Sequence, residues 1–427
     1  MHTTTTKQYG IHEAFVIRED ASFVTAELTI DVRAPHTLES EALRFVFTEA
    51  LQAGCGSYTR EAFIHAQSIL GTTIRVTAHD TFVQVSIRAR NAVLSKVIAL
   101  VKDMLTHPTF TPSELKRIKQ HLTNILKLSK EDARPRAHEQ FVNLLVSEND
   151  WRYSFDTDEL IAAIGNVQVK NLKLFHKSIF TGVWIATYGG TEKDSKKVAA
   201  AYRALHAGRG SGDTLQYIGT VREIEKKTLS LIDIPSKQNI EFSIGAPLPI
   251  FRDHPDFPAL VFGISVLGLY GGFSGRLMST VREKEGLTYM IYARIEDVTK
   301  HDEGYWRIAT FFTPQEAVRG ITATILEITT LRDNGITHDE LKRFKAILKT
   351  RATLIRDSLS KTVQEIHSRQ QVDETEAEHE ALLEKIHSLT TAHVNTVLKK
   401  YINPNSLIIS GAGPTKSVES VLKKLTV

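Results

Sequence analysis

Hydrophobic residues recur with two periods along this chain, and the two periods alternate in the same order twice. Strict alternation of apolar and polar residues is typical of strands, whereas apolar residues spaced three and four apart are typical of helices. These patterns predict strands at 72–79, 81–90, 289–297 and 305–312, and helices at 91–105 and 315–335. Each half therefore contains two neighbouring strands followed by a long amphipathic helix.

A short segment is repeated almost letter for letter after each of these helices. Residues 114–117, Glu-Leu-Lys-Arg, recur at 340–343, which is 226 positions later. Each copy follows a threonine, Thr111 or Thr337, and has the glutamate at the third helical position. Threonine followed by glutamate three residues later predicts a capping box at the start of a helix.

Each half also ends in the same way, with an apolar strand followed by a helix. The strands are predicted at 183–190 and 406–413, and the helices at 193–205 and 415–425. We interpret the chain as an α+β protein of two homologous domains, each a mostly antiparallel sheet with helices packed on one face. The predicted division is a first domain at 1–206, a linker at 207–222 and a second domain at 223–427.

Composition limits the function without deciding it. The chain has 427 residues and a net charge of +4, with basic and acidic residues interspersed, so nucleic acid is not an expected partner. Cys55 is the only cysteine, which excludes an internal disulfide and a zinc site of paired cysteines. The uncharged stretch 257–273 is too short to span a bilayer and predicts a buried helix and a glycine turn. The polar N-terminus lacks a signal pattern, so we expect a cytoplasmic protein without a membrane partner.

Two motifs in the second half carry a family resemblance. GGFSGRL at 271–277 and VREKEGLTY at 281–289 both precede the predicted strands of the second half, at the place that the family's pattern leads one to expect. With them the chain resembles the M16 zinc peptidases (pitrilysin, mitochondrial processing peptidase), and within that family the short bacterial M16B subunits. The resemblance covers essentially the whole chain and implies a LuxS/MPP-like fold for both domains.

Active members of that family carry His-x-x-Glu-His on a helix of the first half. Residues i and i+4 share a helix face, so the two imidazoles hold zinc, and the glutamate acts as general base. Anchored on Gly54, the motif positions fall here on Phe45, Thr48 and Glu49, and the region expected to supply a third ligand, 121–126, has no carboxylate. We therefore expect no metal in this chain.

One partial match to the motif lies nearby. His36-Thr-Leu-Glu39-Ser agrees with four of the five motif positions, but it directly follows Pro35. We place it in the loop before the helix. A rearranged metal site built from His36, Glu39 and Glu49 is an alternative that the sequence leaves open.

The second half keeps the residues that face the zinc in the family. The resemblance implies that Arg282 and Tyr289 bind the substrate backbone and stabilise the tetrahedral intermediate, and that Gly271, Gly272 and Ser274 contact substrate. A guanidinium and a phenol are donors that suit a developing oxyanion. A structural alternative pairs Arg282 with Glu285 and makes Tyr289 a half-buried strand residue. Tyr292 is a rival tyrosine that departs from the seven-residue spacing.

The resemblance thus implies a metal-free subunit of a heteromeric M16 metallopeptidase. Its partner would be a subunit with an intact zinc motif, its substrate a peptide, and its Arg282–Tyr289 pair would complete the partner's zinc site. By itself the chain would be inactive. Two alternatives stay open, namely a non-enzymatic scaffold or peptide-binding protein, and an independent metallopeptidase with a rearranged site.

Overall fold

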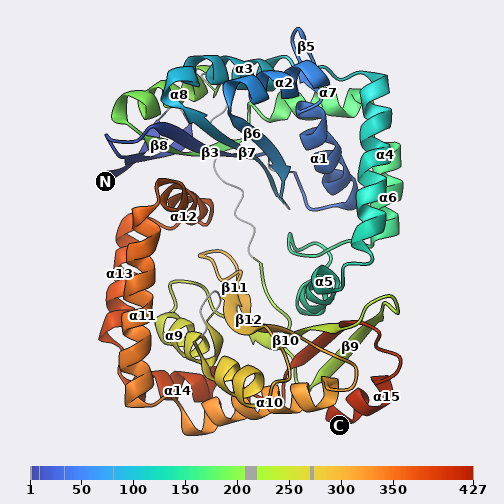
Figure 1. Cartoon of the computed structure of the whole chain (residues 1–427), viewed down its shortest axis with the longest axis vertical. Coiled ribbons are helices and arrows are strands. Elements are labelled where there is room, and N and C mark those ends of the chain that lie inside the picture. The colour runs from blue at the N-terminus through green and yellow to red at the C-terminus, as the bar shows by residue number, and fades with distance from the viewer. Residues whose placement is uncertain are drawn as a thin grey trace. The chain divides into compact units, whose positions relative to one another are not determined.

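Two compact units make up the structure, a computed structural model that describes residues 2–8, 10–32, 34–79, 81–206, 219–269 and 274–426. Each unit is assembled from three separate stretches of chain (Figure 1). Unit 1 consists of Met1–Lys127, Phe155–Leu215 and Ala352–Glu374, and unit 2 of Leu128–Ser154, Gln216–Arg351 and Thr375–Val427. Most of the predicted linker, 207–218, lies outside the described residues.

Each unit is built on one mixed but mostly antiparallel sheet. Unit 1 has the order β1-β2-β8-β3-β7-β6, in which only β2 and β8 are parallel. Its strands are β1 (His2–Gln8), β2 (Ile11–Ile17), β3 (Phe23–Asp31), β6 (Thr73–Ala78), β7 (Phe82–Arg90) and β8 (Val183–Gly190). Unit 2 has the order β11-β12-β10-β13-β9, in which only β13 and β9 are parallel. Its strands are β9 (Thr228–Asp233), β10 (Ile240–Leu248), β11 (Ile291–Glu296), β12 (Gly304–Phe312) and β13 (Ile408–Gly413).

The two sheets have the same topology. Strands β2-β8-β3-β7-β6 of unit 1 correspond one to one with β9-β13-β10-β12-β11 of unit 2, including the direction of every pairing. Strand β1 is an additional edge strand of the first sheet. The internal duplication and the α+β fold class predicted from the sequence are confirmed.

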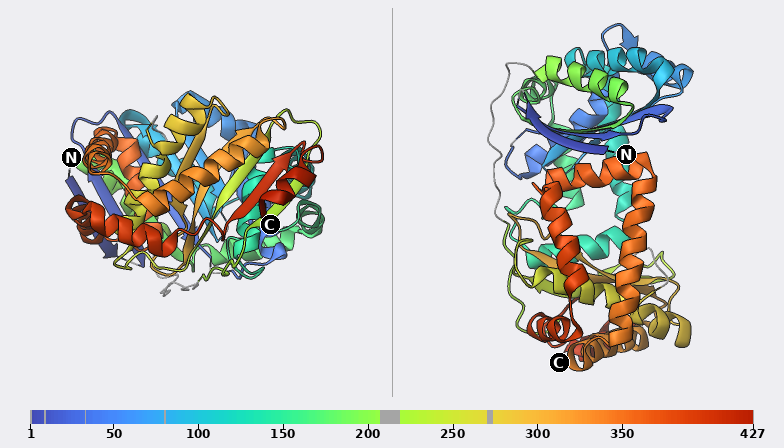
Figure 2. Two further views of the ribbon diagram at one scale, coloured as in Figure 1. Left: turned by 90° about the horizontal axis from the view of Figure 1, so that it is seen from below. Right: turned by 90° about the vertical axis from the view of Figure 1, so that its left-hand side faces the viewer.

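Helices cover the apolar face of each sheet (Figures 1 and 2). Those of unit 1 are α1 (Leu38–Leu51), α2 (Arg60–Leu70), α3 (Leu94–Thr106), α4 (Pro112–Ser129), α6 (Thr157–Asn166), α7 (Val169–Ser178) and α8 (Glu192–His206), with a 3-10 turn at Asn91–Val93 and a short hairpin of β4 (Gly54–Cys55) and β5 (Tyr58–Thr59). Those of unit 2 are α9 (Phe257–Gly268), α10 (Ala317–Asn334), α11 (His338–Asp357), α13 (Glu376–Ser388), α14 (Thr391–Tyr401) and α15 (Glu419–Leu422), with a π-helix at Met278–Lys284 and a 3-10 turn at Lys423–Thr426. Large aromatic residues anchor both cores, among them Phe47 and Trp184 in unit 1 and Phe262 and Trp306 in unit 2.

The opposite face of each sheet carries one helix from the other half of the sequence. Helix α12 (Leu359–Gln371), which follows the second-half repeat, packs on β8, β3 and β2 of unit 1. Helix α5 (Ala133–Leu145), which follows the first-half repeat, packs on β13, β10 and β9 of unit 2. Figure 1 shows α12 on the side of its sheet away from α3 and α8. The two halves therefore exchange equivalent helices.

The predicted helix starts are present at the repeated segment. Thr337 and Glu340 form a full capping box, because Glu340 N donates to the threonine hydroxyl at 3.2 Å and Thr337 N donates to the glutamate carboxylate at 2.8 Å. In the first copy, Glu114 N donates to Thr111 Oγ1 at 3.2 Å, while the Glu114 carboxylate accepts from Arg117 at 2.8 Å. Both threonines act as N-caps, as the spacing predicts.

None of the helices in the described part of the chain combines the length and apolar character that a membrane span requires. Residues 257–268 of the longest uncharged stretch form α9, and all but one of these residues are buried. The first part of that stretch is thus a core helix, as predicted.

Candidate functional site

The helix at the zinc-motif position of the resembled family is α1, and its side chains serve the core. Phe45 packs against the main apolar cluster of unit 1. Thr48 is buried, and its hydroxyl donates to the carbonyl oxygens of Arg44 at 3.1 Å and Phe45 at 3.0 Å. A phenyl ring offers a metal no lone pair, and a hydroxyl bonded into its own helix does not act as a carboxylate base. These positions do not fit a zinc ion with its general base.

His36 lies in the loop before α1, as the sequence predicts, but Glu39 lies inside the helix and not in that loop. Thr37 caps the helix through a hydrogen bond from Ser40 N at 3.2 Å, so His36 precedes it and Glu39 lies in its first turn. The His36 ring is buried and stacks on Phe155 with centroids 4.9 Å apart. Its ring therefore packs against an aromatic neighbour.

Potential metal ligands do not gather elsewhere in the described ranges. Across them, no three His, Cys, Asp or Glu side chains are placed so that they could share a metal ion. His36, Glu39 and Glu49 all lie in these ranges, and the structure does not bring them together.

The structure does bring Arg282 and Tyr289 together in unit 2. The guanidinium carbon of Arg282 lies 4.8 Å from the centre of the Tyr289 ring, within the range of a cation–π contact. Tyr289 is 73% exposed, so it is not the half-buried aromatic of the structural alternative. Glu285, the other candidate partner of Arg282, is paired with Arg319 at 2.6 Å. The pair thus presents a cation and a phenol O–H at the surface of unit 2.

An irregular helix end places these two side chains. Arg282 lies in the π-helix Met278–Lys284, where Glu285 N donates to Thr280 O at 2.9 Å, five residues back. Gly286 follows with φ of 68°, a left-handed conformation that glycine adopts without strain, and reverses the chain. π-helical turns are rare and frequently lie at functional sites.

Buried neighbours hold Tyr289 on the strand side. Leu287 and Thr288 are buried just before it, and the Thr288 hydroxyl accepts from Met290 N at 3.3 Å. Strand β11 then begins at Ile291, two residues after Tyr289, so the tyrosine precedes the strand that the sequence predicted to carry it.

The glycine-rich segment before the π-helix is anchored at both ends. Gly271 and Gly272 lie outside the described residues. Ser274 is described, and its carbonyl oxygen accepts from Leu269 N at 3.3 Å, which closes the loop. Gly275 has φ of 127°, and a Cβ there would lie 2.8 Å from Gly268 Cα, so the backbone requires glycine at this approach.

An ion pair fixes the start of the helix that bears Arg282. Arg276 Nε and Nη2 each donate to the Glu340 carboxylate at 2.8 Å, and Nη2 also donates to Gly335 O at 2.6 Å. Both side chains are about 15% exposed. Because Glu340 also caps α11, one carboxylate joins the glycine-rich segment to that helix.

A charged network on the α5 face of the second sheet was missed by sequence reasoning. Arg307 donates to both oxygens of Glu296, at 2.6 and 2.9 Å, and to Ser243 Oγ at 3.3 Å. Burial opposes the ionisation of Glu296, but the hydrogen bonds and charge of Arg307 outweigh it and lower the pKa of that carboxyl. Burial, with repulsion from Arg307, lowers the pKa of His138 on α5 to about 4. The alternation of polar residues along β11 was the available signal.

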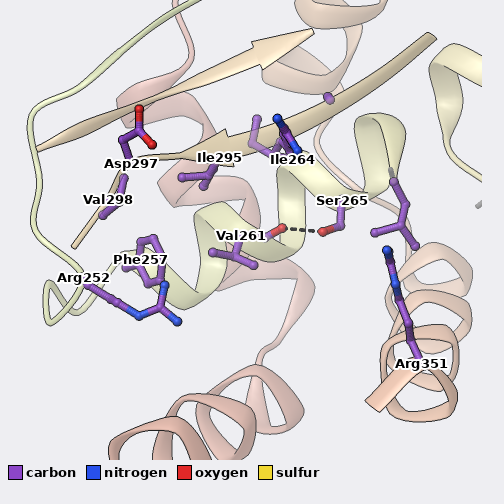
Figure 3. Close-up of a pocket in the computed structure, with 12 residues that line it drawn as sticks. Arg252, Phe257, Val261, Ile264, Ser265, Ile295, Asp297, Val298 and Arg351 are labelled. Carbon is purple, nitrogen blue, oxygen red and sulfur yellow. Dashed lines mark hydrogen bonds between the residues drawn. The ribbon is translucent and has the colours of Figure 1, made fainter. Parts of the chain in front are cut away.

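A cavity beside β11 was also missed. It has a volume of about 330 Å³ and lies between α9, the end of β11 and α11 (Figure 3). Its apolar lining includes Val261 and Ile264, and its charged lining includes Arg252, Asp297 and Arg351. These residues are far apart in the sequence and carry no motif.

Comparison with known proteins finds a family model that matches part of the chain. Residues 184–348 match the family model described as the peptidase M16 inactive domain. This part of the chain is therefore similar to M16 inactive domains. The matched range runs from β8 to α11 and includes both Arg282 and Tyr289. The resemblance to the M16 family that the sequence motifs predicted is confirmed.

Proteins similar to this chain include both a peptidase and a non-peptidase by name. The chloroplastic stromal processing peptidase of Pisum sativum is 33% identical over 107 residues, which are 25% of this chain and 8% of the pea protein. The non-peptidase homolog YmxG of Helicobacter pylori is 21% identical over 372 residues, which are 85% of this chain and 82% of that protein.

A solved structure shows the same fold over nearly the whole chain. The peptidase M16 inactive domain from Pseudomonas fluorescens superposes with a TM-score of 0.81 at 21% identity. The superposition covers 97% of this chain and 99% of the other. The two proteins therefore share the two-unit fold.

Proposed function

We propose that this M16 protein is the metal-free subunit of a heteromeric zinc peptidase and that Arg282 and Tyr289 complete a peptide-binding site on its partner. The observation that carries the proposal is the contact between these two side chains, with the phenol exposed. A buried tyrosine would serve the core, whereas an exposed tyrosine beside Arg282, at a glycine-anchored helix end, is accessible to a ligand. The resembled family places an Arg and a Tyr at this spacing.

The two side chains have complementary roles in such a site. The guanidinium of Arg282 would bind a peptide carbonyl and stabilise negative charge that develops there, and the Tyr289 hydroxyl would donate a hydrogen bond to the same group. The contact between them limits the rotamers of both side chains, so less conformational entropy is lost when peptide binds. The metal would be held by a partner chain that carries an intact His-x-x-Glu-His motif, because α1 does not fit one.

Reconstitution tests the proposal. The chain, its candidate partner and their mixture are each assayed for cleavage of a quenched fluorescent peptide and for bound zinc. We expect cleavage from the mixture, no cleavage from this chain, and zinc in proportion to the partner alone. Stoichiometric metal in this chain together with chelator-sensitive cleavage would reject the proposal in favour of a rearranged metallopeptidase.

A second candidate function is a non-enzymatic scaffold or peptide-binding protein. It is favoured by the relative of Helicobacter pylori, which is named a non-peptidase homolog and is similar over most of both chains. The variant Arg282→Ala separates the two functions in the reconstituted complex. A scaffold would leave cleavage unchanged, whereas the proposed site would lose most of it. Arg319→Ala is the matched control, because Arg319 is an exposed arginine paired with Glu285.

A further inference from the structure

Helix α2 leaves most of its apolar side chains at least partly in solvent. Phe63 is the one residue of this 11-residue helix that is buried, whereas Ile64 and Ile69 are 47% and 69% exposed. Tyr58, in the hairpin just before α2, is 37% exposed. An exposed apolar surface with polar residues around it is typical of an interaction site.

The exposed side of α2 borders a groove in the surface of unit 1. Helices α2 and α3 lie side by side on one face of the sheet, next to the β4–β5 hairpin (Figure 1). The groove has a volume of about 560 Å³. The short side chains of Ala66 on α2 and Ala99 on α3 leave this space, and Ile69, Leu70 and Leu100 give it a largely apolar lining.

Both ends of α2 are fixed, so the groove exists before a ligand binds. Thr59 caps the first turn by accepting from Ala62 N at 3.3 Å, and Gly71 ends the helix with φ of 56°. Between them, the Gln67 side chain accepts from Ile74 N on β6 at 3.0 Å. A partner that docks here orders little of this chain, which lowers the entropic cost of binding.

Two lysines give the groove a positive charge. Lys96 and Lys102 line it and are exposed, and neither side chain forms an ion pair or hydrogen bond with a residue in the described ranges. The acidic lining residue, Asp103, is engaged, because its carboxylate accepts from the Cys55 thiol and lies 3.1 Å from His107 Nδ1. The two lysines are therefore the charged lining residues that a ligand can pair with.

We propose that this groove binds an amphipathic helix of a partner protein, whose apolar stripe packs between α2 and α3 and whose flank carries acidic residues. Lys96 and Lys102 are six residues apart on α3, which is about 9 Å along the helix axis. A ligand with one carboxylate, such as a fatty acid, pairs with one lysine, whereas acidic residues two turns apart on a docked helix pair with one lysine each. Lysine is a point charge on a flexible stem, so these pairs form without a fixed geometry.

The docking site does not rest on the proposed function. Every residue that lines the groove belongs to unit 1, whereas Arg282 and Tyr289 belong to unit 2. Docking can therefore be measured on the isolated full chain, whether or not that chain completes a peptidase.

Binding of designed helices tests the site. Three labelled peptides of about 18 residues, or five turns, share one leucine stripe and carry Glu, Gln or Lys on its flanks, residues of similar helix propensity. Fluorescence polarisation should show the Glu peptide binding about tenfold more tightly than the Gln peptide, as two exposed ion pairs together supply. The Lys peptide should bind more weakly still, and the differences should shrink as salt is raised.

A variant that fills the groove locates the binding. Ala99→Trp places an indole between the two helices and should weaken binding of the Glu peptide by about tenfold or more. Because Ala99 is exposed, the melting temperature should stay near the wild-type value.

Charge reversal tests the two lysines. Lys96→Glu combined with Lys102→Glu should change the preference from the Glu peptide to the Lys peptide. The matched control Lys116→Glu reverses an exposed lysine of α4 outside the lining and should keep the wild-type order. If the double reversal lowers the melting temperature, Lys96→Gln with Lys102→Gln replaces it and should make the Glu and Gln peptides bind equally.

Several results would overturn the docking site. They are equal binding of the three peptides by the wild type, an unchanged order in the charge-reversal variant, and wild-type affinity of Ala99→Trp. Tighter binding of dodecanoate than of the Glu peptide would assign the groove to an acyl chain instead. A dimer that Ala99→Trp dissociates, detected by sedimentation, would assign it to a second copy of this chain.

Discussion

Arg282 and Tyr289 are in cation–π contact, with the guanidinium carbon 4.8 Å from the ring centre, although a π-helix end and a left-handed glycine separate them in the sequence. The contact depends on the chain reversal at Gly286. It gives this protein two hydrogen-bond donors at one surface point, where the sequence alone shows two residues seven positions apart.

Removing the Tyr289 hydroxyl should lower activity without lowering stability. In the reconstituted complex, Tyr289→Phe is expected to reduce kcat/KM by about 10²-fold, the usual loss for one donor to a developing oxyanion. The free energy of unfolding should change by less than about 0.5 kcal/mol, because the phenol is exposed. Tyr292→Phe is the control and should leave kcat/KM near the wild-type value. Equal effects of the two variants would count against the role of Tyr289.

Gly275→Ala and Gly286→Ala should lower the free energy of unfolding by different amounts, although both glycines have positive φ. At Gly275 a Cβ would lie 2.8 Å from Gly268 Cα, so overlap adds to backbone strain, and we expect a loss of about 3 kcal/mol or more. At Gly286 a Cβ meets nothing within 4 Å, so only the left-handed strain of about 1–2 kcal/mol applies. Urea unfolding measures both, and equal losses would contradict the close approach.

His367 should make unit 1 less stable in mild acid. Its ring nitrogens lie 2.9 Å from Thr29 Oγ1 and 3.1 Å from Thr187 Oγ1, and burial, with repulsion from His79, lowers its pKa from 6.5 to about 3. The unfolded chain therefore binds this proton first, and stability falls as pH drops below 6.5, by up to about 1.4 kcal/mol per pH unit.

The variant His367→Asn isolates that contribution. It should cost about 1–2 kcal/mol at pH 7.5, since two buried hydroxyls each lose one of their hydrogen bonds. Its stability should fall less than that of the wild type between pH 7.5 and 5.5. His65→Asn, at an exposed position on α2, should follow the wild-type pH curve. Parallel curves for His367→Asn and the wild type would refute the assignment.

The Arg276–Glu340 pair should show strong coupling. A double-mutant cycle to alanine is expected to give a coupling free energy of about 1–3 kcal/mol, because the pair is bidentate and mostly buried. The control cycle on Arg319 and Glu285, whose side chains are 58% and 36% exposed, should give less than about 1 kcal/mol. A coupling for Arg276–Glu340 as small as the control would show that the ion pair does not anchor the glycine-rich segment.

Much of the fold was predictable because the same local sequence patterns occur in both halves of the chain. The alternation that defines β6, β7, β11 and β12 and the threonine caps of α4 and α11 each depend on a few neighbouring residues. Because the halves repeat, an element predicted in one half is supported by its counterpart in the other half. The absence of metal ligands at Phe45 and Thr48 follows from side-chain chemistry alone.

The exchange of α5 and α12 could not be predicted in the same way. An apolar stripe such as Leu359, Val363 and Ile366 shows that a helix buries one face, but it does not identify the sheet that receives it. The cavity between Arg252 and Arg351 was hidden for a related reason, since its lining is set by tertiary packing across 100 residues of sequence. The role of Arg282 and Tyr289 stays a prediction.

The helix exchange also bears on how the chain acquires its structure during synthesis. Unit 1 includes Ala352–Glu374, so its sheet stays uncovered on one side until those residues have left the ribosome, when most of the polypeptide already exists. Domains of ordinary connectivity fold in turn from the N-terminus. Here neither unit can fold completely before the other. If the two halves were expressed as separate chains, each would lack the helix that covers one face of its sheet and would expose a hydrophobic surface.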